Sequence, residues 1–274
     1  MKNIAFKQVD NTAISIFRIL FGLLLMLEGF GAILTGWVKN VFIDPEFTFS
    51  FIGLSFLQPL PGNGMYFYFI ALGFLGMAIM LGYKYRFAML GYAILWTGVY
   101  FMQKTSYNNH YYLMLLLNWV MVFVPANRRF SIDAKQNPEL YSNKVSQWVP
   151  LLFIIQIGIV YTYAAIAKLY PGWLDLTVPN SILSTPRNWP YIGKIFEPNF
   201  NAYAVAYVGI FYDLLVVPAL LWKPTRRFAF AFSVFFHLFN SIVVQVGVFP
   251  YMALGFCVFF FPPYTLHRVF RIKI

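Results

Sequence analysis

The stretch "IFRILFGLLLMLEGFGAILTGWV", residues 16–38, indicates what kind of protein this chain is. It exceeds the roughly 20 mostly apolar residues that a helix needs to cross the hydrocarbon core of a bilayer. The run is also too long for the apolar core of a cleavable signal peptide, and it lacks a small-residue cleavage site. We therefore expect it to remain in the protein as the first membrane span.

The composition of the whole chain extends this reading. Of the 274 residues, 60% are hydrophobic and only 11% are charged, whereas about 25% are charged in ordinary soluble domains. Such a chain cannot cover itself with polar surface. It is predicted to be an all-α integral membrane protein that forms one transmembrane domain over 1–274, with no soluble domain.

Comparable apolar runs recur along the chain and predict a polytopic bundle of about eight transmembrane helices. The runs are 16–38, 65–83, 87–103, 110–125, 148–170, 202–222, 227–245 and 247–264. Only the weak break "VVQVGVFPY" separates the last two, so 227–264 also fits one long bent helix or a re-entrant element.

Positive charge predicts the orientation. Assigning the loops of an eight-span chain alternately to two sides puts fourteen Lys and Arg residues on one side and four on the other. The larger set is Lys2, Lys7, Lys84, Arg86, Arg128, Arg129, Lys135, Lys144, Lys223, Arg226, Arg227, Arg268, Arg271 and Lys273, and the smaller is Lys39, Lys104, Arg187 and Lys194. Because cytoplasmic loops carry the excess of Lys and Arg, both termini are predicted to be cytoplasmic. The net charge of +11 then reflects orientation and attraction to anionic lipid, and no nucleic-acid partner is expected.

Two long segments on the predicted outer side, 40–64 and 171–201, are rich in Phe, Trp, Leu and Pro. This composition is unusual for solvated loops. We expect both segments to lie in the headgroup layer or to fold over the helices as lids.

Polar residues at membrane depth are costly and often functional. Arg18 lies near the inner end of the first span, where it can snorkel to the interface. Glu28 and Asp213 fit either a structural hydrogen-bonding role or a functional one. Cys257 is expected to be buried filler, and a single cysteine excludes an intrachain disulfide or a cysteine-cluster metal site.

Lys168, in "YTYAAIAKLYPGW", is the strongest candidate for chemistry. Ala164 and Ala165 lie on the same helix face and leave room beside the amine, and Tyr161 lies two turns back. Desolvation favours the neutral amine, which can act as a base, whereas the C-terminal end of a helix favours the cation. On these residues alone, a functional base and a snorkelling lysine both remain open.

Two further polar sets accompany Lys168. "KTSYNNH", residues 104–110, is the predicted outer turn before the fourth span, and one of Asn108, Asn109 and His110 is expected to cap that helix. His237, Asn240 and Ser241 in "FFHLFNS" follow i, i+3, i+4 spacing on one helix face, where they serve either as polar contacts between helices or as part of a site.

These motifs resemble the vitamin K-dependent γ-carboxylase, within the HTTM membrane-domain family, over about residues 14 to 263. The similar segments are "FRILFG", "PLPGNGMY", "MLGYKYR", "KTSYNNHYYL", "PANRRFSID", "YAAIAKL" followed by Trp173, "FHLFNS" and "GVFPYM". Only the membrane part is matched, because this chain ends at "HRVFRIKI" without the large lumenal C-terminal region of the carboxylase.

The resemblance implies a defined chemistry at the outer face of the membrane. In the family, the lysine matched by Lys168 deprotonates a reduced naphthoquinone, of vitamin K or menaquinol type. Epoxidation of that quinol by O2 is coupled to carboxylation of a glutamate γ-carbon by CO2, without a metal. The residues matched by Asn109 and His110 assist catalysis, and Tyr161, Asn108, His237 and Asn240 are expected to bind the quinol.

Two readings from different classes follow. The first is a quinol-dependent oxygenase or carboxylase that acts on a peptide or protein glutamate, with room for a separate subunit in place of the lumenal region. The second is a non-enzymatic HTTM membrane protein, a binding or maturation partner or a transporter, that retains the scaffold.

Overall fold

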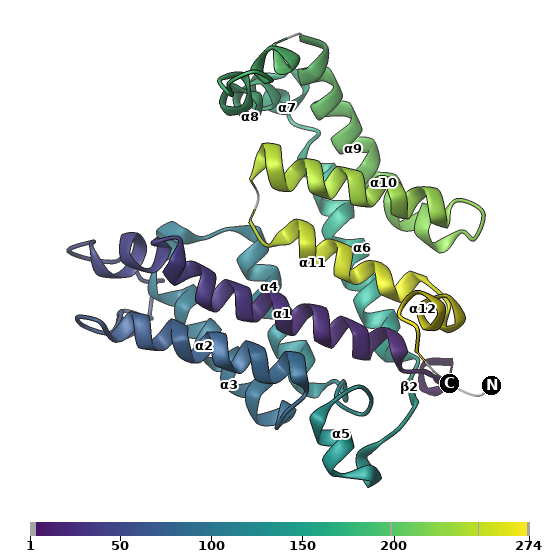
Figure 1. Ribbon diagram of the computed structural model, residues 1–274. Coiled ribbons are helices and arrows are strands. Elements are labelled where there is room, and N and C mark those ends of the chain that lie inside the picture. Colours follow the sequence, from purple (N-terminus) through teal and green to yellow (C-terminus); the bar gives the residue numbers. More distant parts are fainter. Residues whose placement is uncertain (1–3, 198, 246, 273–274) are drawn as a thin grey trace. The chain divides into compact units, whose positions relative to one another are not determined.

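The computed structural model describes residues 4–197, 199–245 and 247–272. The chain forms two compact units, which we describe one at a time: Met1–Val149 with Pro263–Ile274, and Pro150–Pro262. The described residues are mostly helical, with little strand (Figure 1). The predicted all-α class is confirmed, and the prediction of one domain over 1–274 stays a prediction.

The first unit holds the N-terminal half of the chain and its last helix. Its α-helices are α1 Thr12–Leu34, α2 Gly64–Leu81, α3 Tyr85–Met102, α4 Asn109–Phe123, α5 Ile132–Gln136 and α12 Pro263–Val269. Its strands are β1 Gln8–Asp10 and β2 Lys144–Ser146, and its short 3-10 and π segments are Ile4–Phe6, Lys39–Ile43, Lys104–Ser106 and Pro138–Leu140.

The second unit begins within the long helix α6. Its α-helices are α6 Trp148–Ala167, α7 Pro171–Leu174, α8 Thr177–Arg187, α9 Asn199–Leu221, α10 Arg226–Phe239 and α11 Phe249–Phe256. Its short 3-10 and π segments are Gly193–Phe196, Asn240–Val244 and Cys257–Phe260.

Five helical segments in the described part of the chain are long and apolar enough to cross a membrane, so the protein is an integral membrane protein. They are Thr12–Leu34, Gly64–Leu81, Trp148–Ala167, Asn199–Leu221 and Arg226–Val244. The other predicted spans correspond to α3, α4 and the 12-residue segment Phe249–Phe260. A total of eight crossings stays a prediction.

The region 227–264 forms two helical segments rather than one long bent helix. The first continues from α10 through the π-helical turn Asn240–Val244, and the chain then takes left-handed backbone conformations at Gln245 (φ 56°) and Gly247 (φ 63°). At 1.5 Å per residue, the second segment measures about 18 Å, which is shorter than the roughly 30 Å hydrocarbon core.

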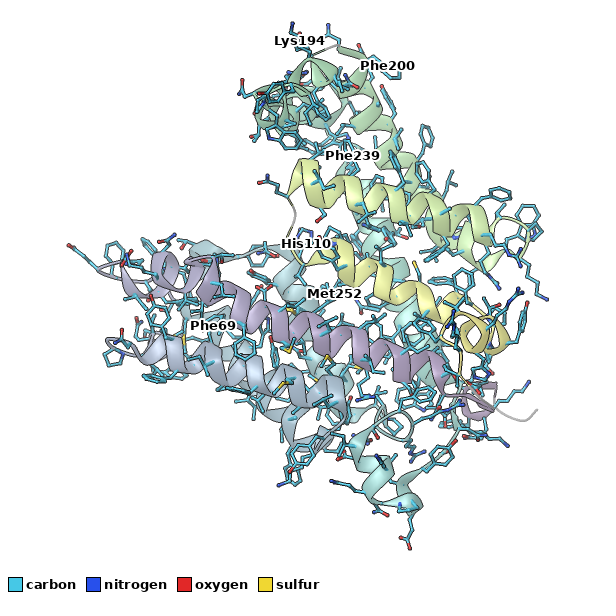
Figure 2. The ribbon with its side chains drawn as sticks, in the orientation of Figure 1. Phe69, His110, Lys194, Phe200, Phe239 and Met252 are labelled. Carbon is cyan, nitrogen blue, oxygen red and sulfur yellow. The ribbon has the colours of Figure 1, made fainter. Side chains whose placement is uncertain are left out.

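Helices α1 and α2 pack at unusually close range in the first unit. A Cβ atom added to Gly29 would come within 2.5 Å of the Gly73 backbone nitrogen, and one added to Gly76 would overlap the backbone of Met26. Small residues allow this approach between membrane helices. Phe69 of α2 is fully buried in the same unit (Figure 2).

The snorkelling predicted for Arg18 is wrong. Its side chain is fully buried, and its guanidinium donates to the carbonyl oxygens of Ile79 (3.0 Å), Met80 (2.9 Å) and Phe130 (2.6 Å). Arg18 thus adds hydrogen bonds to carbonyls in the last turn of α2, where regular helical N–H donors run out.

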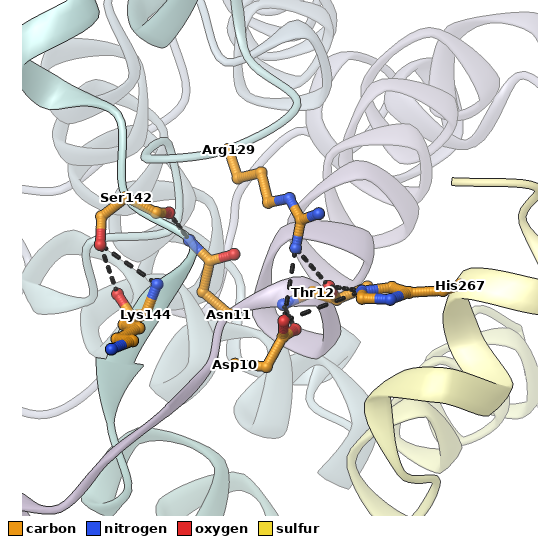
Figure 3. Close-up of polar contacts among 7 residues, drawn as sticks. All are labelled: Asp10, Asn11, Thr12, Arg129, Ser142, Lys144 and His267. Carbon is orange, nitrogen blue, oxygen red and sulfur yellow. Dashed lines mark hydrogen bonds and ion pairs between the residues drawn. The ribbon is translucent and has the colours of Figure 1, made fainter. Parts of the chain in front are cut away.

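The ends of the first unit are joined by a polar cluster (Figure 3). Strand β1 pairs antiparallel with β2. Arg129 Nη1 donates to Thr12 Oγ1 at 2.7 Å and lies 3.5 Å from Asp10 Oδ2, while His267 Nε2 lies 2.8 Å from Thr12 Oγ1. These contacts tie the N-terminus, the basic 126–147 segment and α12 to one another.

Part of the segment 171–201 packs against its own unit, and its expected place in the headgroup layer or as a lid stays a prediction. Leu176 and Leu183 are buried in an apolar cluster with Ala202 and Ala206 of α9 and with Val243. The predicted core role of Cys257 is also supported, because its side chain is buried in the second unit.

Candidate functional site

Lys168 lies immediately after α6, which ends at Ala167 rather than at the predicted residue 170. Its backbone N–H donates to the carbonyl of Ala165 at 3.1 Å, in a tight terminal turn. Pro171 then starts α7, which suits a residue with a fixed φ and no N–H to donate. The side chain of Lys168 is therefore held at a break between two helices.

The amine of Lys168 forms an ion pair with Asp213 of α9. Its Nζ lies 2.5 Å from Asp213 Oδ2, donates to the Ala164 carbonyl at 3.3 Å, and lies 5.3 Å from the ring centroid of Trp173. The Asp213 side chain is only 5% exposed, and that of Lys168 is 21% exposed. The pair is thus largely buried, and Lys168 is its more exposed member.

The Lys168 and Trp173 side chains lie against α9. A Cβ added to Gly209 would lie in ordinary van der Waals contact with Lys168 Cε at 3.6 Å and with Trp173 Cζ2 at 3.7 Å, so both side chains lie beside this glycine. Trp173 Nε1 also donates to the Ala206 carbonyl at 3.2 Å. The indole ring is therefore fixed beside the lysine.

Asp213 was not predicted as a partner of Lys168. The signal in the sequence was an acidic residue inside an apolar span, which normally pairs with another polar group. Lys168 lies 45 residues away, so the choice of partner depends on which helices meet.

A second polar cluster lies in the interior of the same unit. His237 Nε2 lies 2.7 Å from the Tyr161 hydroxyl and 3.1 Å from the Tyr212 hydroxyl, and the two hydroxyls lie 3.4 Å apart. All three side chains are buried. Tyr161 and His237 were both expected to bind the quinol, which stays a prediction, and Tyr212 was not among the expected residues.

The rest of the predicted His237 face diverges from this cluster. Asn240 is half-buried at the point where α10 widens into a π-helical turn, and the Ser241 hydroxyl pairs with the Tyr251 hydroxyl at 2.7 Å. Since a π-turn has a different residue spacing from an α-turn, regular i, i+3, i+4 alignment ends here.

The "KTSYNNH" stretch lies in the first unit. Asn108 is the N-cap of α4, and its side chain accepts from the backbone N–H of Tyr111 at 2.8 Å. Asn109 Oδ1 accepts from the Tyr107 hydroxyl at 2.9 Å, and half-buried His110 lies in the first turn of α4 (Figure 2). These residues belong to the first unit and Lys168 belongs to the second, so their predicted convergence around one cavity stays a prediction.

Glu28 has a structural partner in the first unit. The Tyr111 hydroxyl donates to Glu28 Oε1 at 2.7 Å. This contact joins α1 to α4 and supports the hydrogen-bonded reading of Glu28. Across the described residues, no group of three or more His, Cys, Asp or Glu side chains is placed to hold a metal ion.

Comparison with known proteins identifies the family. The HTTM domain matches residues 6–264, which include the Lys168–Asp213 pair, the Tyr161 cluster and "KTSYNNH". No solved structure matches the chain. Since the domain match extends over nearly the entire sequence, the chain belongs to the HTTM domain family.

Proposed function

We propose that this protein is a membrane-embedded, quinol-dependent oxygenase of carboxylase type, with Lys168 and Asp213 at its centre. The observation that carries the proposal is the ion pair of a partly exposed lysine with a buried carboxylate, beside the Trp173 ring. Charged pairs inside membrane proteins often mark proton-transfer sites. Membership of the HTTM family and the matched motifs also support an activity of carboxylase type.

The donor set suits a reduced naphthoquinone. Trp173 offers an aromatic surface, and the carboxylate and amine provide an acceptor and a donor for a phenolic O–H. When bound, the quinol would supply the reducing electrons and, with O2, the strong base that carboxylation by CO2 requires. The surrounding apolar helices would keep water away from that base.

The ion pair determines which of the two groups accepts the phenolic proton. An amine already protonated by pairing with a carboxylate cannot accept a second proton. We therefore assign the incoming phenolic proton to Asp213, while the Lys168 ammonium stabilises the negative charge left on the ligand oxygen. The pair starts neutral and ends with one positive charge, which balances the anion it creates.

The remaining predicted residues have positioning roles in this proposal. Tyr161, His237 and Asn240 would orient the quinol, and the same role is proposed for Asn108, Asn109 and His110 on the strength of the matched motif. We place the site toward the outer face, with a peptide or protein glutamate as acceptor and a separate subunit as its presenter.

The test is to incubate purified protein with reduced menaquinone or vitamin K and O2, and to measure the epoxide by chromatography. We expect Lys168→Met and Asp213→Asn each to lower the rate by about a hundredfold or more. Lys168→Arg should not rescue it, because guanidinium lacks the geometry and compactness of an ammonium. His110→Ala should have a smaller effect.

The matched control is Lys194→Met, which removes an exposed lysine from the same predicted side and the same unit. It should leave the rate unchanged. If the wild type makes epoxide and Lys168→Met makes it equally fast, the assignment of the site is wrong.

The alternative function is that of a non-enzymatic HTTM membrane protein, either a binding or maturation partner or a transporter. One observation favours it: Lys168 contacts Asp213, the Ala164 carbonyl and Trp173 within the protein itself. Those contacts alone would join α6 to α7 and α9. Tight binding of reduced quinol without any epoxide, in the presence of a glutamate peptide, O2 and CO2, would favour this alternative.

A further inference from the structure

An apolar groove of about 530 Å³ runs between α9 and α10. On α9 it is lined by Val208, Phe211, Leu215 and Ala219, whose spacing of three and four residues places them on one helix face. Phe211 and Leu215 are more than half exposed. The groove is therefore open to the surroundings of the second unit.

One end of this groove meets a basic and aromatic turn, Trp222 to Arg227. Trp222 is 62% exposed, and Lys223 and Arg227 are also exposed. Neither cation forms an ion pair with another described residue. The guanidinium of Arg226, in contrast, donates to the carbonyls that end α9.

The groove is separate from the Lys168 site. Lys168 packs against Gly209 of α9, and at 3.6 residues per turn Phe211 points about 200° away from that position. Val208 and Leu215 lie on the same side as Phe211. Lys168, Asp213 and Trp173 do not line the groove, whereas Tyr212 of the Tyr161–His237 cluster does. A ligand in the groove would therefore border that cluster and not the Lys168–Asp213 pair.

We infer that this groove binds one acyl chain of an anionic phospholipid, whose phosphate contacts Lys223 and Arg227. The lining from Tyr207 to Ala219 extends about 18 Å along α9, close to the roughly 15 Å thickness of one leaflet's hydrocarbon. Trp is favoured at the membrane interface, and Lys and Arg there attract anionic headgroups. The charge pattern predicts the cytoplasmic leaflet as the source.

The experiment reconstitutes the full chain in nanodiscs with equal amounts of phosphatidylglycerol and phosphatidylcholine, and counts retained lipids by native mass spectrometry. We expect the wild type to retain one phosphatidylglycerol preferentially. The double variant Lys223→Ser/Arg227→Ser should weaken that binding by about thirtyfold. Ala229→Phe, which fills the groove from α10, should remove it while leaving the basic turn intact.

The matched control is Lys135→Ser/Lys144→Ser, which removes two exposed lysines from the same predicted side without touching the groove. It should retain the lipid. Equal loss in this control would mean that net charge alone attracts the lipid, and unchanged binding in Lys223→Ser/Arg227→Ser would refute the headgroup site. Occupation of the groove by an isoprenoid quinone, displaced by Ala229→Phe with phosphatidylglycerol unaffected, would overturn the proposal as well.

Discussion

Breaking the Lys168–Asp213 ion pair from one side should be far more damaging than removing both charges. Lys168→Met leaves the Asp213 carboxylate, only 5% exposed, without its partner at 2.5 Å. Removal of one member of a buried pair typically costs about 3–5 kcal/mol, whereas replacement of both by apolar residues is often nearly neutral. Lys168→Met/Asp213→Leu should therefore recover most of the stability lost in Lys168→Met.

The assay is thermal unfolding of the purified variants in one detergent. A loss of about 3–5 kcal/mol corresponds to a fall in Tm of roughly 6–20 °C for a chain of this size. The control is Lys39→Met, which breaks an ion pair of 3.1 Å whose side chains are 58% and 49% exposed. Exposed pairs contribute at most about 1 kcal/mol, so Tm should fall by less than about 4 °C.

A double variant as unstable as Lys168→Met would refute this reasoning. It would show that the two charges are not coupled in the folded protein. The proposed transfer of the quinol proton to Asp213, with the Lys168 ammonium stabilising the anion, would then lose its structural basis.

Three further predictions concern topology, helix packing and pH. Cysteines at Ser106 and Lys135 should be labelled by impermeant reagents from outside and inside respectively, and labelling from the same side would contradict the topology. Gly29→Ala should destabilise the α1–α2 pair by about 1–3 kcal/mol in thermal unfolding, whereas Gly31→Ala, which points into open space, should be neutral or stabilising. The backbone N–H of Thr177 donates to the Asp175 carboxylate and lowers its pKa. The stabilisation of α8 by this carboxylate should therefore be complete above the ordinary aspartate pKa of about 4, and it should be lost as pH falls through the lower pKa of the folded protein. Hydrogen exchange of α8 should show this loss in the wild type and not in Asp175→Asn.

Several features could be predicted because they depend on short stretches of sequence. Long apolar runs must form helices in a membrane, since each backbone N–H and C=O has to be satisfied within the segment. The cap of α4 is similarly local, because Asn108 needs only the N–H of Tyr111, three residues on. The prominence of Lys168 also followed from its own neighbours on one helix.

The helix ends were less predictable. Hydropathy alone continued the fifth span to residue 170, but α6 ends at Ala167. Hydropathy also did not decide whether 227–264 forms one helix or two. Backbone turns at Gln245 and Gly247 separate two helical segments there. Hydropathy measures the preference of side chains for lipid. The side chains around these breaks are mostly apolar, like those of the neighbouring helices, so hydropathy does not mark where a helix ends.

The partners of the buried charges were decided by tertiary packing. Arg18 has room to snorkel in an isolated helix, yet it is buried because carbonyls from α2 and from Phe130 surround its guanidinium. Lys168 could have reached the interface, yet α9 brings Asp213 to its amine. A charge withdrawn from water takes whichever partner the fold brings within a few ångströms, and that distance depends on the packing of helices far apart in the chain.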